Sequence, residues 1–327
     1  MRSVKHSIKK ILTSCGPGRS VLRTLAGPFP RIFVYHRFAP PNTIIPHRVS
    51  ADTFGWQLDR MKDFGRIMTL ADCLEHHHIH GVWPRHAVVI TVDDGYRDFY
   101  LYAFPELKRR SIPATLFPTV NFIEGRVWLW PDRLAAALEG ASDGRITVTA
   151  HGDALEIGWN DNEQRARAWK SLSDLCISLP DHLRQAVIRQ VEDLMRVDLP
   201  VAPPEEYAAC SWGELQEMAA AGIEIGSHTI NHPILSRIPL DNLDHEIADS
   251  KRHLERKIGQ PIKTFCYPNS APGDINDAVV AAVQRAGYLG AVFGTDLKAW
   301  EPWRMPRMGL GESRTDFLWK LVGGEIL

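Results

Sequence analysis

The sequence predicts an α/β protein, because strand-like and helix-like stretches alternate along most of the chain. Short apolar runs at residues 31–37, 88–92 and 112–117 have the length and composition of buried strands, and stretches with helical spacing lie between them. A strand, a helix and a second strand in this order form a βαβ unit, whose strands are parallel. The alternation is typical of a (β/α) barrel or a doubly wound sheet.

Composition and charge argue against several classes of protein. The 327 residues are 44% hydrophobic and 24% charged, as in ordinary globular proteins. A net charge of −1 argues against a general nucleic-acid binder. The five cysteines show no C-x-x-C spacing, which favours free thiols in a reducing compartment and still allows a single disulfide. No apolar run is long enough to span a bilayer.

Residues 1–30 are predicted to form a separate basic segment. No acidic residue occurs between positions 1 and 50. Apolar residues near helical spacing, with lysines between them, indicate a short amphipathic helix that could lie on an anionic membrane surface. The alternative is a frayed basic terminus that pairs with the acidic body. Because the segment lacks the continuous apolar core of a secretory signal, we expect a cytoplasmic protein with peripheral membrane contact through this segment.

The main domain, predicted to span residues 31–327, begins with the strand at 31–37. Apolar residues at helical spacing then predict a helix over 51–64, and Thr69 is the predicted N-cap of a second helix that runs towards Glu75. Four histidines follow, and we expect them in an exposed turn rather than in a metal site: His76, His77, His78 and His80.

Residues 131–210 interrupt the alternation, and we predict a mainly helical insertion or cap that packs on the main domain. Its first part has the pattern of a hairpin, with strands at 145–149 and 154–159. Two amphipathic helices are predicted to follow, roughly at 161–178 and 180–197. The insertion carries no obvious chemical motif.

The alternation of the main domain resumes after the insertion. Ser211 and Glu214 have the spacing of a capping box and predict the start of a helix. A strand at 223–227 then leads into a pair of histidines, His228 and His232. The other elements predicted for the main domain are helices at 98–109, 240–258, 274–286 and 315–322, strands at 264–268 and 288–293, and an extended piece at 304–310.

Two adjacent carboxylates, Asp93 and Asp94, follow the strand at 88–92, and Gly95 then lets the chain turn. Neighbouring carboxylates repel each other, and a bound metal or a raised pKa usually compensates for this repulsion. The alternative is a plain turn after a core strand, with both side chains solvated.

The pair His228 and His232 changes the interpretation of these carboxylates. Four-residue spacing on a helical turn places two imidazoles on one face, as a metal site requires. In barrels and open α/β sheets, functional sites are assembled at the carboxyl ends of strands. Two imidazoles and one carboxylate form a three-ligand site that leaves room for water, and the second carboxylate is then free to act as a base.

Both motifs resemble those of the polysaccharide deacetylases of the NodB-homology group, carbohydrate esterase family four. The stretch T-V-D-D-G at residues 91–95 is similar to the family's T-F-D-D-G motif, and H-T-I-N-H at 228–232 matches its H-[ST]-x-x-H motif. The resemblance covers about residues 32–310, with 131–210 outside the common core. It implies a distorted (β/α) barrel with a mainly helical insertion.

The resemblance also implies roles for the motif residues. Asp93 would be the general base that activates water. Asp94, His228 and His232 would hold a divalent metal, commonly zinc and in some members cobalt, nickel or manganese. The metal would polarise the acetamide carbonyl and the attacking water.

Supporting roles are implied for several neighbours of these motifs. The backbone N–H of Tyr96 would help to hold the oxyanion. Thr229 would orient the ligands through a hydrogen bond within its loop, the alternative being a plain turn hydroxyl. The residues expected to line the sugar groove are Tyr267, Pro268 and Asn269. Four tryptophans could stack on sugar rings or could be core residues: Trp128, Trp130, Trp300 and Trp303.

The chain departs from the family pattern in its third motif and in its general acid. The usual arginine before a proline is missing from F-C-Y-P-N at 265–269, so Arg307 is the candidate that steadies the base, unless it is a surface arginine. Many members supply the general acid from an apolar-apolar-His motif, but no histidine follows Arg307. His36 is our candidate proton donor to the leaving amine, expected across the pocket from Asp93, and a structural role is the alternative.

The resemblance therefore implies a metal-dependent hydrolase that removes N-acetyl groups from an N-acetylated amino sugar in a polysaccharide or lipid-linked glycan precursor. Two alternatives stay open. One is a hydrolase of other non-peptide carbon–nitrogen bonds on the same fold, and the other is a catalytically weak glycan-binding protein. The expected partner is an acetylated glycan or a lipid-linked sugar.

Overall fold

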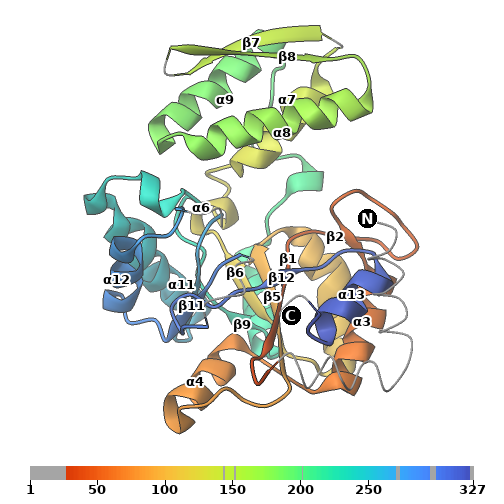
Figure 1. Cartoon of the computed structure of the whole chain (residues 1–327), viewed down its shortest axis with the longest axis vertical. Helices are drawn as coiled ribbons and strands as arrows, with labels where there is room; N and C mark the ends of the chain where they lie inside the picture. The colour runs from red at the N-terminus through yellow and green to blue at the C-terminus, as the bar shows by residue number, and fades with distance from the viewer. Residues whose placement is uncertain are drawn as a thin grey trace.

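A six-stranded parallel sheet forms the larger part of the central barrel (Figure 1). All eight residues of its strand β5 are buried, as expected for a central parallel strand covered on both faces. In order of pairing the sheet contains β12 (Met308–Gly309), β1 (Arg31–Tyr35), β5 (Ala87–Asp94), β6 (Thr115–Pro118) and β9 (Glu224–Ile225), while β4 (Arg66–Met68) pairs with the first residues of β5.

Two further strands close the barrel. β10 (Thr264–Cys266) and β11 (Gly290–Val292) form a parallel pair. Isolated bridges join this pair to the larger sheet on both sides, one between Ser227 and Phe265 and the other between Val292 and Met305. Because bridges connect the pair to the sheet on both sides, the strands form a closed (β/α) barrel rather than a doubly wound sheet. The barrel is distorted because each of the two junctions contains a single bridge.

The structure, a computed structural model, describes residues 27–142, 144–150, 152–200, 202–269, 273–294 and 300–324. Most of the predicted basic segment at 1–30 lies outside these ranges, so its amphipathic helix and its membrane contact stay predictions. Among the described residues, every helix is too short or too polar to cross a bilayer.

Alternation along the strands separates two hydrophobic cores. Side chains such as Phe33 and Ile90 join the larger core, which the surrounding helices share. A smaller core takes Ile32, Val89 and other residues from β6, β10 and β11, so it fills the barrel interior. Since side chains on a strand alternate, Val89 and Asp93 project from the same face of β5. The strand therefore directs Asp93 towards the interior at the carboxyl end of the barrel.

Helices surround the barrel at the positions that the sequence predicts for most of them. Two predicted caps are present: Thr69 accepts from the Asp72 N–H at 3.0 Å, and Ser211 and Glu214 form a capping box. The prediction of Asp274 as the cap of the helix at 274–286 was wrong, because Asn276 is the N-cap of that helix. The helices of the main domain are α3 (Ala51–Phe64), α4 (Leu70–His80), α5 (Phe104–Arg110), α6 (Val120–Ile123), α10 (Trp212–Ala220), α11 (Ser250–Ile258), α12 (Asp277–Arg285) and α13 (Arg314–Leu321).

Shorter elements complete the main domain and shift several predicted bounds. The helix predicted at 240–258 is broken, because a 3₁₀ turn and a π turn precede α11. The helix predicted at 98–109 likewise begins with a π turn. These elements are β2 (Phe38–Ala39), β3 (Val49–Ser50), the π turns η1 (Phe99–Ala103) and η5 (His245–Asp249), and the 3₁₀ turns η2 (Glu205–Tyr207), η3 (Leu235–Arg237) and η4 (Leu240–Asn242).

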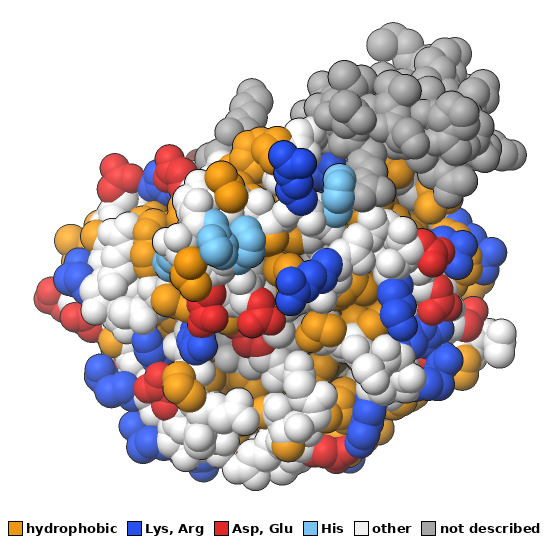
Figure 2. Space-filling model, turned by 90° about the horizontal axis from the view of Figure 1, so that it is seen from below, with side chains coloured by type: hydrophobic (Ala, Val, Ile, Leu, Met, Phe, Trp, Pro, Cys, Tyr) orange, Lys and Arg blue, Asp and Glu red, His pale blue; other side chains and the backbone are white. Residues whose placement is uncertain are grey.

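The histidine cluster at residues 76–80 lies on α4, and its prediction as a turn was wrong. The helix continues to His80 and ends at Gly81, whose left-handed φ of 68° suits a helix C-terminus. Figure 2 views the molecule from the side of α4, and histidine side chains gather on that face. Among the described residues, none of these four histidines belongs to a cluster that could hold a metal.

The insertion forms a unit above the barrel with a hydrophobic core of its own (Figure 1). The predicted hairpin is present as β7 (Gly144–Ala150) and β8 (Asp153–Trp159), which pair antiparallel around position 151, a residue outside the described ranges. The two predicted helices are α8 (Asn162–Ser178) and α9 (Asp181–Met195). A third helix, α7 (Trp130–Gly140), was not predicted, although Pro131 at its first turn is a common helix start.

Candidate active site

Asp93 is buried at the end of β5 and is held by Arg307. One guanidinium nitrogen donates to Asp93 Oδ1 and the other to Oδ2, both at 2.7 Å, so the pair is bidentate. Arg307 is 4% exposed, and it also donates to Thr91 Oγ1 and to the Phe293 carbonyl. Burial alone would raise the pKa of Asp93, but Arg307 holds it below the ordinary value. The carboxylate is therefore ionised at neutral pH.

Asp94 points away from its neighbour because the backbone changes direction there. Its φ is 73°, in the left-handed region that aspartate tolerates better than most residues. Gly95 follows with a φ of 91°, and a Cβ at this position would lie 2.9 Å from Ile123 Cδ1. The D-D-G sequence thus separates two adjacent carboxylates into different surroundings.

Asp94, His228 and His232 converge on one buried point. Asp94 Oδ1 lies 3.5 Å from His228 Nε2 and 3.4 Å from His232 Nε2. The two imidazole rings are 4.8 Å apart and nearly perpendicular, so both Nε2 atoms face the same space. One carboxylate oxygen and two imidazole nitrogens suit a divalent cation. The donor set therefore fits a metal site.

The loop that carries the two histidines is not the helical turn that the spacing suggested. Thr229 and His232 both have left-handed backbone angles, with φ of 70° and 58°. Thr229 Oγ1 accepts from the His232 N–H at 2.9 Å. Glu246 of η5 accepts from the backbone N–H groups of Ile230 and Asn231. These contacts bring together two imidazoles that the sequence alone places on a helix.

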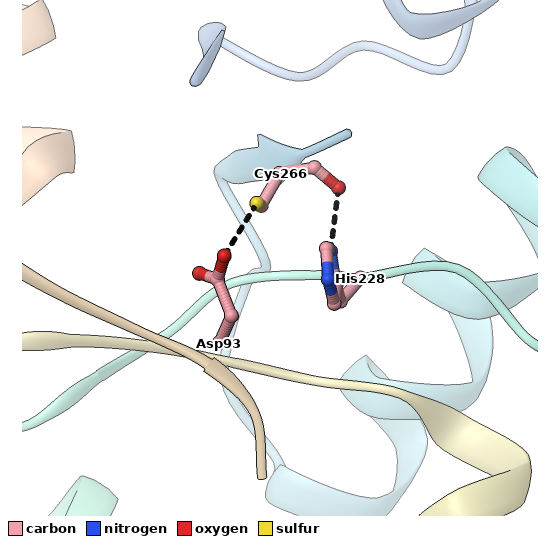
Figure 3. Close-up of side chains that lie close together, drawn as sticks. All are labelled: Asp93, His228 and Cys266. Carbon is pink, nitrogen blue, oxygen red and sulfur yellow. Dashed lines mark hydrogen bonds between the residues drawn. The ribbon is translucent and has the colours of Figure 1, made fainter. Parts of the chain in front are cut away.

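A backbone carbonyl fixes the tautomer of His228. Its Nδ1 lies 2.8 Å from the Cys266 carbonyl oxygen, so Nδ1 carries the proton and Nε2 keeps a lone pair for a metal. Figure 3 shows Cys266 directing its carbonyl to His228 and its thiol to Asp93. The thiol lies 3.5 Å from Asp93 Oδ2.

Asp93, His228 and Cys266 also lie close enough to hold a metal, but their chemistry argues against it. Both oxygens of Asp93 are already engaged by Arg307. Burial raises the pKa of the Cys266 thiol, which therefore stays protonated and is a poor ligand. The set with Asp94 and His232 is thus the better metal site.

His36 lies beside Asp93 rather than across the pocket from it. Its Nε2 is 3.6 Å from Asp93 Oδ2, and its side chain is 54% exposed. It follows β1, the neighbour of β5 in the sheet. The expected position opposite Asp93 is therefore wrong, because strand pairing brings the ends of β1 and β5 together.

The other predicted site residues differ in their access to the site. Tyr96 is buried, and its hydroxyl donates to Asp132 at 2.6 Å. Tyr267 is also buried, packs on Phe265 and donates to the Trp303 carbonyl. Asn269 is half-buried, with a left-handed φ of 57°. Pro268, Trp128 and Trp130 are buried, while Trp300 and Trp303 are half-buried.

Two contributors to the site were missed by sequence reasoning. Glu246 lies fourteen residues beyond His232, in a stretch with the pattern of a surface helix, and no local signal marks it. Asp132 comes from the insertion, where no chemical motif is visible. Its carboxylate lies between the Tyr96 hydroxyl and Arg37, whose guanidinium is 4.1 Å from the centre of the Tyr96 ring.

Comparison with known proteins identifies a family for this geometry. A family model described as polysaccharide deacetylase matches residues 81–176 and 190–291, more than half of the chain. A peptidoglycan-N-acetylglucosamine deacetylase of Bacillus cereus is 35% identical over 74 residues, which are 23% of this chain and 33% of that relative. The match thus spans about a third of the relative's length.

Solved structures agree on the fold. The deacetylase PplD of Streptococcus pyogenes superposes with a TM-score of 0.59 and 18% identity, over 90% of this chain and 99% of that one. IcaB of Ammonifex degensii gives a TM-score of 0.55 and 18% identity, over 91% and 98% of the two chains. With the matching family model, the chain belongs to the polysaccharide deacetylase family, carbohydrate esterase family four.

Proposed function

We propose that this protein is a metal-dependent hydrolase that removes N-acetyl groups from an N-acetylated amino sugar in a polysaccharide or lipid-linked glycan precursor. The proposal rests mainly on one observation: the two adjacent carboxylates at the end of β5 have different surroundings. Asp94 joins two imidazoles in a metal-ligand set, while Asp93 is kept ionised beside it by Arg307. Family membership and the name of the Bacillus cereus relative support the same reaction.

Asp94, His228 and His232 are proposed to hold the divalent cation, with zinc as the first candidate and cobalt, nickel or manganese as others. When bound, the cation would polarise the acetamide carbonyl and increase the acidity of water. The Cys266 carbonyl keeps His228 in the tautomer that can coordinate. Glu246 and Thr229 hold the loop of His232 in place.

Asp93 is proposed as the general base. It takes a proton from the water that attacks the acetamide carbon, and Arg307 keeps the carboxylate ionised and oriented for this transfer. We propose that the Tyr96 backbone N–H donates to the carbonyl oxygen as negative charge develops on it. The carbon–nitrogen bond then breaks, and acetate and the free amine are released.

His36 is proposed to supply the proton that the leaving amine requires. It is the exposed partner of the buried Asp93, with 3.6 Å between Nε2 and Oδ2. This spacing lets the two groups handle the proton in succession at one side of the substrate. The buried Tyr267 and Pro268 support the wall of the site, and the half-buried Asn269 is the residue of this group proposed to contact the sugar.

The test is acetate release from a panel of acetylated glycans and nucleotide- or lipid-linked sugars, with and without a chelator. We expect release that the chelator abolishes and added metal restores. Asp93→Asn should lower kcat by about 10²- to 10⁴-fold with little change in KM, as for loss of a general base. His36→Gln should also lower kcat. Arg167→Met is the control, because Arg167 lies on α8 of the insertion in an exposed ion pair with Glu163.

A catalytically weak glycan-binding protein is the second candidate, because no histidine follows Arg307 to act as the family's usual acid. It would be favoured if the metal-loaded protein released no acetate from any acetylated sugar while glycan binding survived Asp93→Asn. Hydrolysis of small ureides without any release of acetate from sugars would indicate a different carbon–nitrogen hydrolase.

A further inference from the structure

A cavity of about 530 Å³ lies between the insertion and the loop that carries His232. On the insertion side it is lined by Trp130 of α7 and Arg184 of α9. On the barrel side it is lined by Asn231 and Pro233, the two neighbours of His232 in the chain. The cavity therefore adjoins the proposed metal centre, and its volume is in the range of pockets that hold a sugar-sized ligand.

Arg184 lines this cavity with hydrogen-bonding capacity that the described protein does not use. Its side chain is 1% exposed, and one terminal nitrogen, Nη2, donates to Asp181 Oδ1. Nε and Nη1 are buried and have no hydrogen-bond partner among the described residues. A buried guanidinium with unpaired N–H groups is costly, since each group has lost its water without replacement. Such a group in a cavity next to a site indicates a missing acceptor.

Two tryptophans at the cavity add further donors. The indole N–H groups of Trp128 and Trp130 are buried and are likewise unpaired within the described part of the chain. The guanidinium of Arg184 lies 5.6 Å from the centre of the Trp130 ring. These donors come from α9, from α7 at the start of the insertion, and from the segment just before α7.

The acidic side chains that line the cavity already have partners. The carboxylate of Glu246 receives the N–H groups of Ile230 and Asn231 and the side-chain amide of Asn231. Asp181 is engaged by Arg184 itself. Arg133, a second basic residue of the lining, is neutralised by a bidentate contact with Glu192. A ligand that satisfies Nε and Nη1 of Arg184 must therefore bring its own acceptors, and the oxygens of a carboxylate or a phosphate would supply them.

We propose that this cavity binds an anionic group, a carboxylate or a phosphate, carried by the sugar unit or the linkage next to the acetamido sugar, with Arg184 as its main contact. This inference rests on the proposed deacetylase function and narrows its substrate class to acidic glycans or sugar phosphates. A planar guanidinium matches both groups, because it can present two parallel N–H donors to two oxygens. The source of the anion is what the experiment distinguishes.

The test compares kcat/KM for three substrates that share one acetamido sugar: a neutral oligomer, a disaccharide that contains a uronic acid, and the sugar 1-phosphate. We expect one anionic substrate to exceed the neutral oligomer by about 10- to 100-fold, mainly through KM, as charged hydrogen bonds predict. Preference for the uronate indicates an acidic polysaccharide, and preference for the phosphate indicates a phosphate-linked precursor.

Arg184→Met should reduce the ratio of anionic to neutral kcat/KM to about one, while Arg184→Lys should keep part of it. Arg167→Met is the matched control, because Arg167 lies on α8 of the same unit in an exposed ion pair with Glu163. We expect this control to leave both the ratio and the activity unchanged. Equal kcat/KM for all three substrates in the wild type would overturn the proposal.

Thermal unfolding separates this role from a purely structural one. Replacing a buried, poorly paired charge with an apolar side chain of similar size is commonly neutral or stabilising, so Arg184→Met should keep or raise the Tm. A fall in Tm with equal losses on all substrates would assign Arg184 to the fold and contradict the proposal. If no substrate released acetate, calorimetry with the sugar 1-phosphate and the uronate disaccharide would still test the subsite, since binding lost in Arg184→Met supports it and no binding overturns it.

Discussion

Cys266 and Arg307 together reproduce an interaction that the family usually builds from one segment. The family's third motif places an arginine shortly before a proline, and this chain has Cys266 in that motif instead. The small thiol leaves room for the guanidinium of Arg307, whose Nη2 lies 3.2 Å from the sulfur. Arg307 thus reaches Asp93 from the segment before β12. The same bidentate contact can therefore be made by an arginine from a different part of the chain.

Removing the guanidinium of Arg307 should therefore impair the proposed base, Asp93, and also destabilise the fold. Arg307→Met leaves a buried carboxylate unpaired, which costs about 3–5 kcal/mol of unfolding free energy. We expect kcat/KM to fall by about 10- to 100-fold, as for other residues that orient a catalytic group. Urea unfolding and steady-state kinetics measure the two effects. Arg304→Met is the control, because Arg304 lies in the same segment as Arg307 but pairs with the exposed Asp277 of α12. An equal loss in both variants would contradict the assignment.

The main residues of the candidate site could be proposed from the sequence because their signals are local. An acidic pair at the end of an apolar strand and two histidines at a fixed spacing need no three-dimensional information. The position of His36 depends on the pairing of β1 with β5, and that of Glu246 on how η5 packs against the histidine loop. Pairing and packing join residues that are far apart in the chain, so no pattern in one stretch reveals them.

At the level of elements, α7 connects the insertion to the site. Asp132 lies in its first turn, accepts from the Tyr96 hydroxyl and faces Arg37 at 4.0 Å. Burial raises the pKa of Asp132 to about 7, and the charges of Asp94 and Asp98 act in the same direction, whereas Tyr96 and Arg37 lower it. A helix of the insertion therefore places a group that titrates near neutral pH beside the motif of β5.

This shift predicts a stability that depends on pH. The folded protein holds the proton of Asp132 up to about pH 7, while the unfolded chain loses it near the ordinary value of 3.8. The stabilisation of the folded state that comes from the bound proton of Asp132 is therefore complete below about pH 4, and it is lost as the pH rises to about 7. In chelator-treated protein, the stability advantage of the wild type over Asp132→Asn should shrink between pH 5 and pH 8. Urea unfolding at both values tests this, and a constant or growing difference would refute it.

Element prediction succeeded where the chain carries its own start and stop signals. The capping box at Ser211 and the cap at Thr69 are examples, since a few neighbouring side chains decide them. It failed for the end of α4, because histidines neither stop nor strongly favour a helix and only Gly81 terminates it. The break before α11 could not be predicted because it depends on tertiary contacts. In the π turn η5, Glu246 accepts hydrogen bonds from the backbone N–H groups of Ile230 and Asn231 in the loop that carries the two histidines.

For the whole molecule, one of the two weakly paired junctions of the barrel lies close to the proposed metal site. The sheet is joined to β10 through a single bridge at Ser227, the residue before His228. Asp94 belongs to β5, whereas both histidines follow β9, and β6 lies between these two strands. One ion would tie the ends of β5 and β9 together across β6, and one of its ligands, His228, also contacts the Cys266 carbonyl of β10. The metal should therefore help to hold the carboxyl end of the barrel closed.

Metal binding should therefore stabilise the whole fold as well as support activity. A ligand that binds only the folded protein adds about 2.7 kcal/mol at a free concentration of 100 times its Kd. Thermal and urea unfolding across a zinc titration should show this gain, and a chelator should remove it. Asp94→Asn is the decisive control, because it removes one ligand of the proposed site. It does not change the histidines and thiols through which zinc could bind the unfolded chain, so that effect is the same in both proteins. If Asp94→Asn gained as much stability from zinc as the wild type, the ion would be bound elsewhere, and the closure of the barrel would owe nothing to it.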